Sequence, residues 1–321
     1  MEKGFNSIEV MDTKESILDN PEKQITLFRK LESVYSQRPD IGTFEGAMSE
    51  SKDAAKYTKE AIGKDVAYVE DIRRKIDEKN SSHGRQILDR NEMGFQLSEI
   101  LQAMIVDRMN HHWFKDVKAI MTSDFDDLRV GIDAVLKHKD GGYLGTAFDF
   151  TVSSQESVIE KKLVREWERN IKTGKIPTIK YFEDPDTHQK GSLLVPKFIV
   201  GASKKDVEDL AAAYIEDNQD VLENHPFKYL ILQQIEEQLQ TILDYYETND
   251  LPQLSFAKKK YEQIQSLLRG MKKDIHADEH MTVDLHEYSK KSVALDTMRR
   301  FRIMREKGVV FEDVSDDEIG E

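Results

Sequence analysis

The sequence has no cysteine among its 321 residues, which excludes disulfide bonds and thiolate metal sites and fits a reducing compartment. It also has no long apolar run. The longest nearly apolar stretch, Leu193 to Ala202, is interrupted by Pro196 and Lys197 and is too short to span a bilayer. Residues 1–15 mix charged and isolated apolar positions, unlike a secretory signal. We therefore expect a cytoplasmic protein with no membrane partner.

The chain also lacks an excess of positive charge. Its 47 basic and 61 acidic side chains give a formal net charge of −14. Broad, non-specific coating of nucleic acid needs a basic surface that displaces counterions, so the composition disfavours that mode and leaves room for a local basic groove. The sequence contains neither a glycine-rich phosphate loop nor a nucleophile elbow.

Charged residues make up 34% of the chain and apolar residues 38%, which suits a core that carries long exposed helices. Apolar positions at helical spacing predict helices over residues 25–35, 43–79, 226–248 and 256–273. Residues 311–321 hold six acids and no base, which is typical of a disordered tail. We expect a helical N-terminal arm (1–84), an α/β core (85–202), a helical C-terminal region (203–310) and an acidic disordered tail (311–321).

Within the core, the apolar pattern alternates between helical and strand periods. It predicts a helix over residues 86–113, strands over 117–121, 128–138 and 143–152, a helix over 154–173, and strands over 178–182 and 193–200. This order predicts the α+β class, with a mixed sheet flanked by helices.

Two of the predicted strands form a hairpin that carries one aspartate on each strand. Asp133 and Asp149 each lie on the less apolar face of their strand. Their small neighbours on these faces, Gly131, Gly145 and Ala147, leave room for a ligand. Aspartates on an exposed hairpin face are more often only solvated, and this interpretation stays open.

The turn between these strands decides whether the two aspartates meet. A three-residue turn over residues 140–142 pairs Lys139 with Tyr143 and places Asp133 opposite Asp149. Directly opposed Cβ atoms lie about 4.5–5.5 Å apart. Two carboxylates at that spacing repel each other unless a cation or a proton lies between them, and Mg²⁺ or Mn²⁺ suits such oxygen ligands.

The segment SDFDDLRVGID over residues 123–133, followed by GTAFDFT over residues 145–151, resembles the active-site hairpin of the PD-(D/E)XK nuclease superfamily. In that family an aspartate ends the first motif, an acid-x-lysine tripeptide follows on the next strand, and a helix before the strands often adds a glutamate. The resemblance covers residues 86–202 and implies a restriction-endonuclease-like core.

The resemblance also implies a set of site residues. Asp133 and Asp149 would be the two motif acids, and Glu99 would be the helix glutamate, with Glu92 as its alternative. The carbonyl of Phe150 would add a backbone ligand. Mg²⁺ or Mn²⁺ held by these groups would activate a water molecule that attacks a phosphodiester. For Asp126 and Asp127, which are within reach, we prefer a role in a turn or at the start of a strand.

One position departs from the family pattern. Thr151 stands where the family has its catalytic lysine. Lysines migrate within this superfamily, and we favour Lys161 or Lys162 on the following helix. Lys137 shares a strand face with Asp133 but lies about 13 Å away along the strand.

Three functions compete at this point. The first is a metal-dependent nuclease that cleaves phosphodiester bonds in DNA. The second is a catalytically inactive nuclease-fold scaffold that binds nucleic acid or protein, which Thr151 favours. The third is a helical interaction protein with a structural α/β core. The helical arms would suit a homodimer, and the run Lys258 to Lys260 with Arg269 could contact phosphate, although we prefer a solvated face for it.

Overall fold

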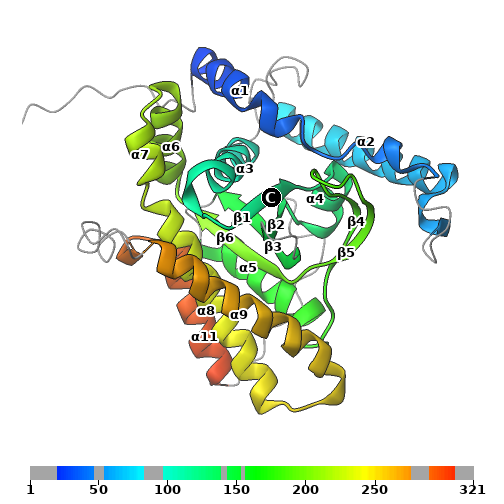
Figure 1. Cartoon of the computed structure of the whole chain (residues 1–321), viewed down its shortest axis with the longest axis vertical. Helices are drawn as coiled ribbons and strands as arrows, with labels where there is room; N and C mark the ends of the chain where they lie inside the picture. The colour runs from blue at the N-terminus through cyan, green and yellow to red at the C-terminus, as the bar shows by residue number, and fades with distance from the viewer. Residues whose placement is uncertain are drawn as a thin grey trace, which may run out of the picture.

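The computed structural model describes residues 20–46, 54–82, 97–138, 143–152, 156–275 and 289–307. The predicted α+β class is confirmed, because helices surround a four-stranded sheet and a separate two-stranded sheet (Figure 1). Within these ranges no helix is long and apolar enough to cross a membrane.

The larger sheet has the strand order β1-β2-β3-β6. Its strands are β1 (Val117–Met121), β2 (Ala134–His138), β3 (Tyr143–Val152) and β6 (Lys197–Ala202). β2 is antiparallel to β1 and β3, and β6 is parallel to β3. The connection from β3 to β6 contains helix α5 (Glu156–Glu166). The bounds of β1 and β3 are those that the sequence predicts.

The segment before β2 is a helix and not the strand that the sequence predicts. Residues Asp124–Val130 form helix α4, so the strand predicted over 128–138 is wrong in its first half. The side chain of Ser123 accepts a hydrogen bond from the backbone N–H of Asp126 and begins the helix. Gly131, with φ of 68°, ends it in the left-handed conformation that favours glycine. These local capping signals outweigh the strand-like alternation of apolar residues.

The strand predicted over residues 193–200 is in fact two strands. Pro196, which has no N–H to donate, separates β5 (Lys190–Leu194) from β6. β5 pairs with β4 (Thr178–Glu183) in the two-stranded sheet. Apolar side chains of this small sheet pack on those of β1 and β2, among them Ile179, Ile120 and Val135.

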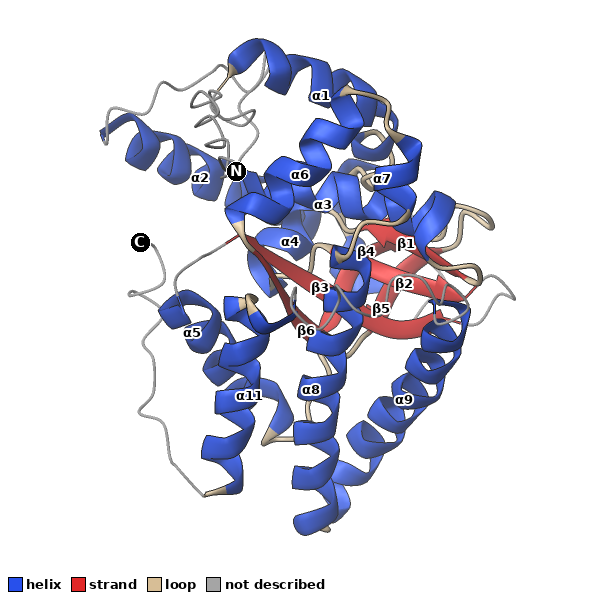
Figure 2. Ribbon diagram, turned by 90° about the vertical axis from the view of Figure 1, so that its left-hand side faces the viewer, coloured by secondary structure: helices blue, strands red, loops and turns tan. Residues whose placement is uncertain are grey.

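Helices cover both faces of the larger sheet (Figure 2). On one side lie α1 (Pro21–Tyr35), α2 (Lys59–Ser82), α3 (Leu97–Arg108), α4, α6 (Lys204–Ile215) and α7 (Gln219–Glu223). On the other lie α5, α8 (Phe227–Thr248), α9 (Ser255–Ile275) and α11 (Val293–Glu306). Short helical turns occupy Ile41–Phe44, Ala54–Tyr57, Met109–Trp113, Trp167–Ile171 and Pro252–Leu254. The helix predicted over 43–79 is thus an α-helix only from Lys59, and residues 83–96 and the predicted acidic tail lie outside the described residues.

β6 is an edge strand, yet its backbone is fully covered by α8. The side-chain amide of Gln234 exchanges two hydrogen bonds with the backbone of Gly201, at 2.7 and 2.9 Å. Gln238 does the same with Ile199, at 2.9 and 2.8 Å. These glutamines satisfy the backbone groups that an edge strand leaves open.

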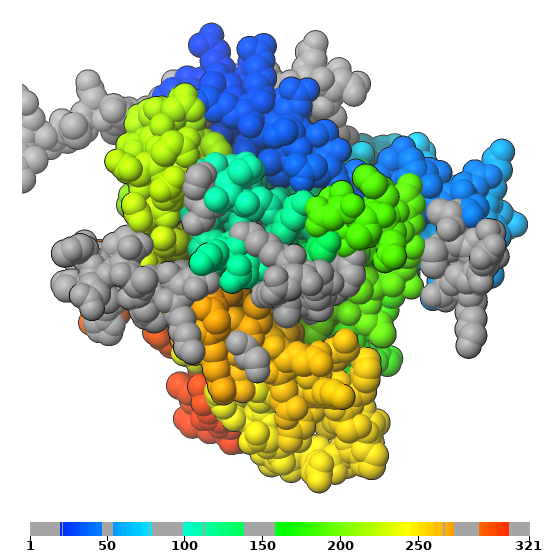
Figure 3. All heavy atoms as spheres, in the orientation of Figure 1, coloured from blue at the N-terminus to red at the C-terminus, as the bar shows by residue number. Residues whose placement is uncertain are grey.

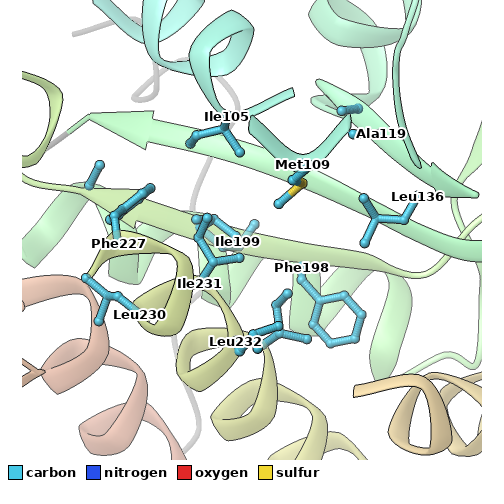
Figure 4. Close-up of a cluster of buried hydrophobic side chains, with 14 of the residues drawn as sticks. Ile105, Met109, Ala119, Leu136, Phe198, Ile199, Phe227, Leu230, Ile231 and Leu232 are labelled. Carbon is cyan, nitrogen blue, oxygen red and sulfur yellow. The ribbon is translucent and has the colours of Figure 1, made fainter. Parts of the chain in front are cut away.

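One apolar core joins the sheet to helices from both ends of the described chain. It includes Leu27 of α1 and Phe301 of α11, and Figure 4 shows its centre around Phe198 and Ile231. At Gly201 a Cβ atom would lie 2.6 Å from that of Ala294, so α11 packs against β6 at a distance that only glycine permits.

Candidate functional site

The two predicted site aspartates belong to neighbouring strands. β2 and β3 pair Ala134 with Phe148, so one further step along the ladder brings position 133 opposite position 149. This is the register that strand parity predicts for the site end of the hairpin. β3 also pairs position 149 with Ile199 of β6, which places it inside the sheet.

The other end of the hairpin is different from the prediction. An irregularity after Leu136 pairs Lys137 with Tyr143, so the predicted pairing of Lys139 with Tyr143 is wrong. The side chains of β3, including those of the predicted site residues Asp149, Phe150 and Thr151, lie outside the described residues, as does Glu92.

Asp133 lies between α4 and β2 and is 7% exposed. Its backbone carbonyl accepts hydrogen bonds from the N–H of Thr122 at 3.0 Å and from the side-chain amide of Gln102 at 2.8 Å. Thr122 follows β1 and Gln102 belongs to α3. Two segments that are separate in the sequence therefore hold the same carbonyl group of Asp133.

Glu99 lies in the first turn of α3, three residues before Gln102, and is half-buried. The hydroxyl of Tyr35 donates a hydrogen bond to the backbone carbonyl of Glu99 at 3.2 Å. Burial, followed by the negative charge of Glu99, raises the pKa of Tyr35 well above its usual value. Tyr35 therefore stays neutral and can act as a hydrogen-bond donor beside this glutamate.

Arg38, which follows α1, reaches into the same region. Its side chain is 14% exposed, and its guanidinium donates hydrogen bonds to Asp124 at 2.9 Å and Asp127 at 3.2 Å. A further hydrogen bond, of 2.7 Å, joins it to the side-chain oxygen of Gln102. The same glutamine therefore bridges Arg38 and the backbone of Asp133.

The charges around Arg38 form one electrostatic group. Burial alone would lower the pKa of Arg38, but the surrounding carboxylates, including those of Glu99 and Asp133, raise it above its usual value. Arg73 of α2 makes an ion pair with Asp124. We call Arg38, Arg73, Glu99, Asp124, Asp127 and Asp133 the Arg38 cluster. It contains four carboxylates and two guanidinium groups, so its acids outnumber its bases by two.

Arg38 and Gln102 belong to this site although no sequence motif assigns them to it. No local pattern marks Arg38, because its hydrogen-bond partners lie 64 to 89 residues further along the chain. Gln102 carries a usable signal, since it lies one helical turn after Glu99. Asp126, for which a turn role was preferred, is fully buried and accepts hydrogen bonds from the backbone N–H groups of Lys180 and Tyr181 at 2.6 and 2.9 Å.

Lys161 and Lys162, the two lysines that the sequence favours, belong to a helix on the opposite face of the larger sheet from α3. Lys161 and Lys162 are half-buried residues in the middle of α5. α5 packs on β6 and α11, on the face of the sheet opposite to α3 (Figure 2). These lysines are therefore on a different helix layer from Glu99.

Lys137 belongs to a second group of charges, in which Lys137 and Asp184 are buried. Its ammonium group contacts the carboxylate of Asp184 at 2.7 and 2.9 Å and that of Asp186 at 2.8 Å. Lys118 pairs with Asp186 at 3.0 Å. We call Lys118, Lys137, Asp184 and Asp186 the Lys137 cluster. Because it ties β2 and β1 to the turn after β4, it has a structural role.

The donor chemistry of the Arg38 cluster fits a hard divalent cation only in part. Glu99 and Asp133 offer carboxylate oxygens of the kind that Mg²⁺ and Mn²⁺ prefer. No group of three or more potential metal ligands is found among the residues that the structure describes. The third predicted acid, Asp149, is opposite Asp133 in register, and its side chain is not among those residues.

Comparisons with family models, curated proteins and solved structures give no match for this chain.

Proposed function

We propose that this chain is a divergent PD-(D/E)XK-type nuclease, a metal-dependent hydrolase of phosphodiester bonds in DNA. One observation carries the proposal: Glu99 and Asp133, from separate elements, both belong to the acid-rich Arg38 cluster. The ladder supports it, because Ala134 pairs with Phe148 and the same register continued by one residue would set position 149 opposite Asp133. The elements that form and flank the larger sheet support it, because they follow one another as α3-β1-β2-β3-α5-β6, with α4 inserted before β2 and β4 and β5 before β6, and the family resemblance implies a helix, three strands, a helix and a strand.

The roles of the residues follow from their positions. Glu99 and Asp133, with Asp149, would hold Mg²⁺ or Mn²⁺, which when bound lowers the pKa of coordinated water and offsets charge on the phosphate. Thr122 and Gln102 keep the backbone of Asp133 in place through its carbonyl. Tyr35 holds the first turn of α3, which carries Glu99.

A surface that could contact DNA apart from the Arg38 cluster is offered by α9, which packs against β3 on the face of the sheet opposite to α3 and lies on the molecular surface (Figure 3). Lys259 and Arg269 are exposed on this helix. Cationic side chains on one exposed helix face are suited to contact successive phosphates, even in a chain with an acidic total charge.

The proposal is tested by calorimetric titration with Mn²⁺ and Mg²⁺, followed by cleavage assays on supercoiled plasmid and labelled oligonucleotides. The wild type should bind metal and cleave, whereas Asp133→Asn and Asp149→Asn should lose both activities. Asp186→Asn, which alters an exposed aspartate of the Lys137 cluster, is the matched control and should behave like wild type.

The second candidate is the catalytically inactive scaffold, which Thr151 in the lysine position favours. A wild-type protein that binds neither metal would rule out the nuclease. Binding of DNA in EDTA by the same sample would then support the scaffold.

A further inference from the structure

We propose that Arg38 is a positioning residue, delivered by the N-terminal arm, that fixes Glu99 and Asp133 in the arrangement a divalent cation requires. This inference rests on the proposed nuclease function. It also assigns the fixed positive charge near the acids to a residue outside the nuclease-like core, whereas the family pattern places a lysine at the position of Thr151.

A side-chain bridge connects Arg38 to Asp133. Gln102 accepts a hydrogen bond from Arg38 at 2.7 Å and donates one to the carbonyl of Asp133 at 2.8 Å. Gln102 is 2% exposed, so water does not readily replace either bond. The position of the guanidinium therefore sets the orientation of the glutamine, and the glutamine sets the position of the Asp133 backbone.

A second connection to Asp133 runs through α4, which leads directly into this residue. Arg38 holds Asp124 and Asp127 at 2.9 and 3.2 Å, in the first turn of this helix. Only six positions separate Asp127 from Asp133, and the backbone bond from Gly131 to the Asp127 carbonyl, at 2.8 Å, closes the helix between them. Fixing α4 thus fixes the entry of the chain into β2.

The backbone of Glu99 also contacts the N-terminal arm. The arm contributes Tyr35, three residues before Arg38, whose hydroxyl bonds to the Glu99 carbonyl at 3.2 Å. Arg38 and Tyr35 therefore hold α3 at two points, Gln102 and Glu99, one helical turn apart. The two acids come from segments that the same short stretch of the arm holds together.

The chemistry of these contacts requires arginine. The planar guanidinium donates to two carboxylates and one amide oxygen at once, in directions that a lysine ammonium cannot reproduce. Groups that orient metal ligands without touching the metal have a measurable effect, since their loss typically weakens metal binding by about 10–100-fold. A simple electrostatic neighbour would act in the opposite direction, because removing a positive charge beside the acids would tighten metal binding.

The sign of the change in Mn²⁺ affinity therefore shows whether Arg38 is a positioning residue or only an electrostatic neighbour of the acids. Calorimetry compares full-length wild type, Arg38→Gln, Arg38→Lys and the control Arg74→Gln, whose ion pairs on α2 are exposed. Each variant is first heated under circular dichroism to find a temperature at which it is fully folded. DNA affinity in EDTA is measured by fluorescence anisotropy on the same samples.

We expect Mn²⁺ affinity to fall about 10–100-fold in Arg38→Gln, with partial recovery in Arg38→Lys and no change in Arg74→Gln. DNA affinity in EDTA should stay at the wild-type value, because Arg38 is buried. If Arg38→Gln does not fold, Gln102→Met tests the same bridge while leaving the ion pairs of Arg38 in place, and it should weaken Mn²⁺ binding as well.

Two results would overturn the inference while leaving the nuclease proposal intact. One is wild-type Mn²⁺ affinity in folded Arg38→Gln or Gln102→Met, and the other is tighter binding in Arg38→Gln. Failure of the wild type itself to bind Mn²⁺ would instead remove both the nuclease function and the inference that depends on it.

Discussion

Two groups of paired charges, each around one largely buried cation, lie at opposite ends of β2, and they are built differently. In the Lys137 cluster, two lysines face two aspartates, and the central pair is almost completely buried, with Asp184 1% exposed. In the Arg38 cluster, four carboxylates share two guanidinium groups. The Lys137 cluster, in which the charges balance, connects β1 and β2 to the turn after β4. The acid-rich group has two carboxylates more than guanidinium groups, which is why we propose it as the place for a further cation.

The largest predicted effect comes from breaking the balanced group. Lys137→Met leaves the carboxylate of Asp184 buried without its cation, which should lower the free energy of unfolding by about 3–5 kcal/mol. Urea unfolding at pH 8 measures this change. Lys118→Met, at a position 34% exposed, is the matched control and should cost less than about 1 kcal/mol. Equal losses in the two variants would contradict the structural role assigned to Lys137.

Protonation of His225, which lies outside both clusters, determines the pH range in which the stabilities of the cluster variants can be compared. Burial lowers the pKa of His225 from 6.5 to about 4. The unfolded chain therefore binds a proton at this residue between these values while the folded chain does not, so stability is complete above pH 6.5 and falls as the pH drops toward 4. The expected loss is about 3 kcal/mol.

Thermal unfolding between pH 4 and 8 measures this loss. The control is His225→Asn, which keeps an acceptor for the N–H of Phe227. This variant should show a flatter pH profile over that window. An unchanged profile would assign the acid sensitivity to other groups.

The next predicted change in the free energy of unfolding is smaller than that of Lys137→Met and has the opposite sign. Glu99→Gln removes one negative charge from the acid-rich group, so the metal-free protein should become more stable, by about 0.5–1 kcal/mol. The same variant should lose Mn²⁺ binding. Urea unfolding in EDTA, with the exposed Glu60→Gln as control, measures the change. A clear loss of stability would mean that Glu99 is a structural partner of Arg38, and would weaken the contrast between the two clusters.

The smallest predicted effect is on DNA binding and comes from removing exposed charges of α9. The double variant Lys259→Gln, Arg269→Gln on α9 should leave unfolding unchanged and weaken DNA binding several-fold. The slope of log affinity against log salt should become shallower by about 0.9 for each phosphate that the variant no longer neutralises. Anisotropy titrations over a range of salt concentrations measure it. Lys205→Gln, an exposed lysine paired with Asp209 on α6, is the control. An unchanged slope would show that DNA does not follow α9.

The sequence predicts the parts of this fold that depend on local patterns. The strands β1 and β3, helices α8 and α9, and the register next to Asp133 all follow from periodicity, parity and Pro226 at the start of α8. The strand predicted across residues 128–133 is wrong because the apolar alternation there is weaker than the capping of α4. Periodicity also carries no sign of the break that Pro196 makes between β5 and β6.

Of the residues in the candidate site, only acidic ones can be predicted from the sequence. Asp133 and Glu99 stand out by strand parity and by analogy to a family motif. Arg38 does not stand out, because a basic residue after a polar helix is common and its role depends on contacts 64 or more residues away in the sequence. Such contacts are fixed by tertiary packing, here by the docking of α1 on α3 and α6.

The close packing of α11 on β6 at Gly201 affects how the chain can be made. The same apolar core contains Leu27 and Leu31 near one end of the described chain and Leu295 and Met298 near the other. A ribosome that adds about 5–20 residues per second needs tens of seconds to pass from one set to the other. During that time β6 lacks α11, one of the helices that pack against it, so this part of the fold is completed only after α11 emerges. We therefore expect a nascent chain of this protein to leave the surface of β6 around Gly201 uncovered until α11 has emerged.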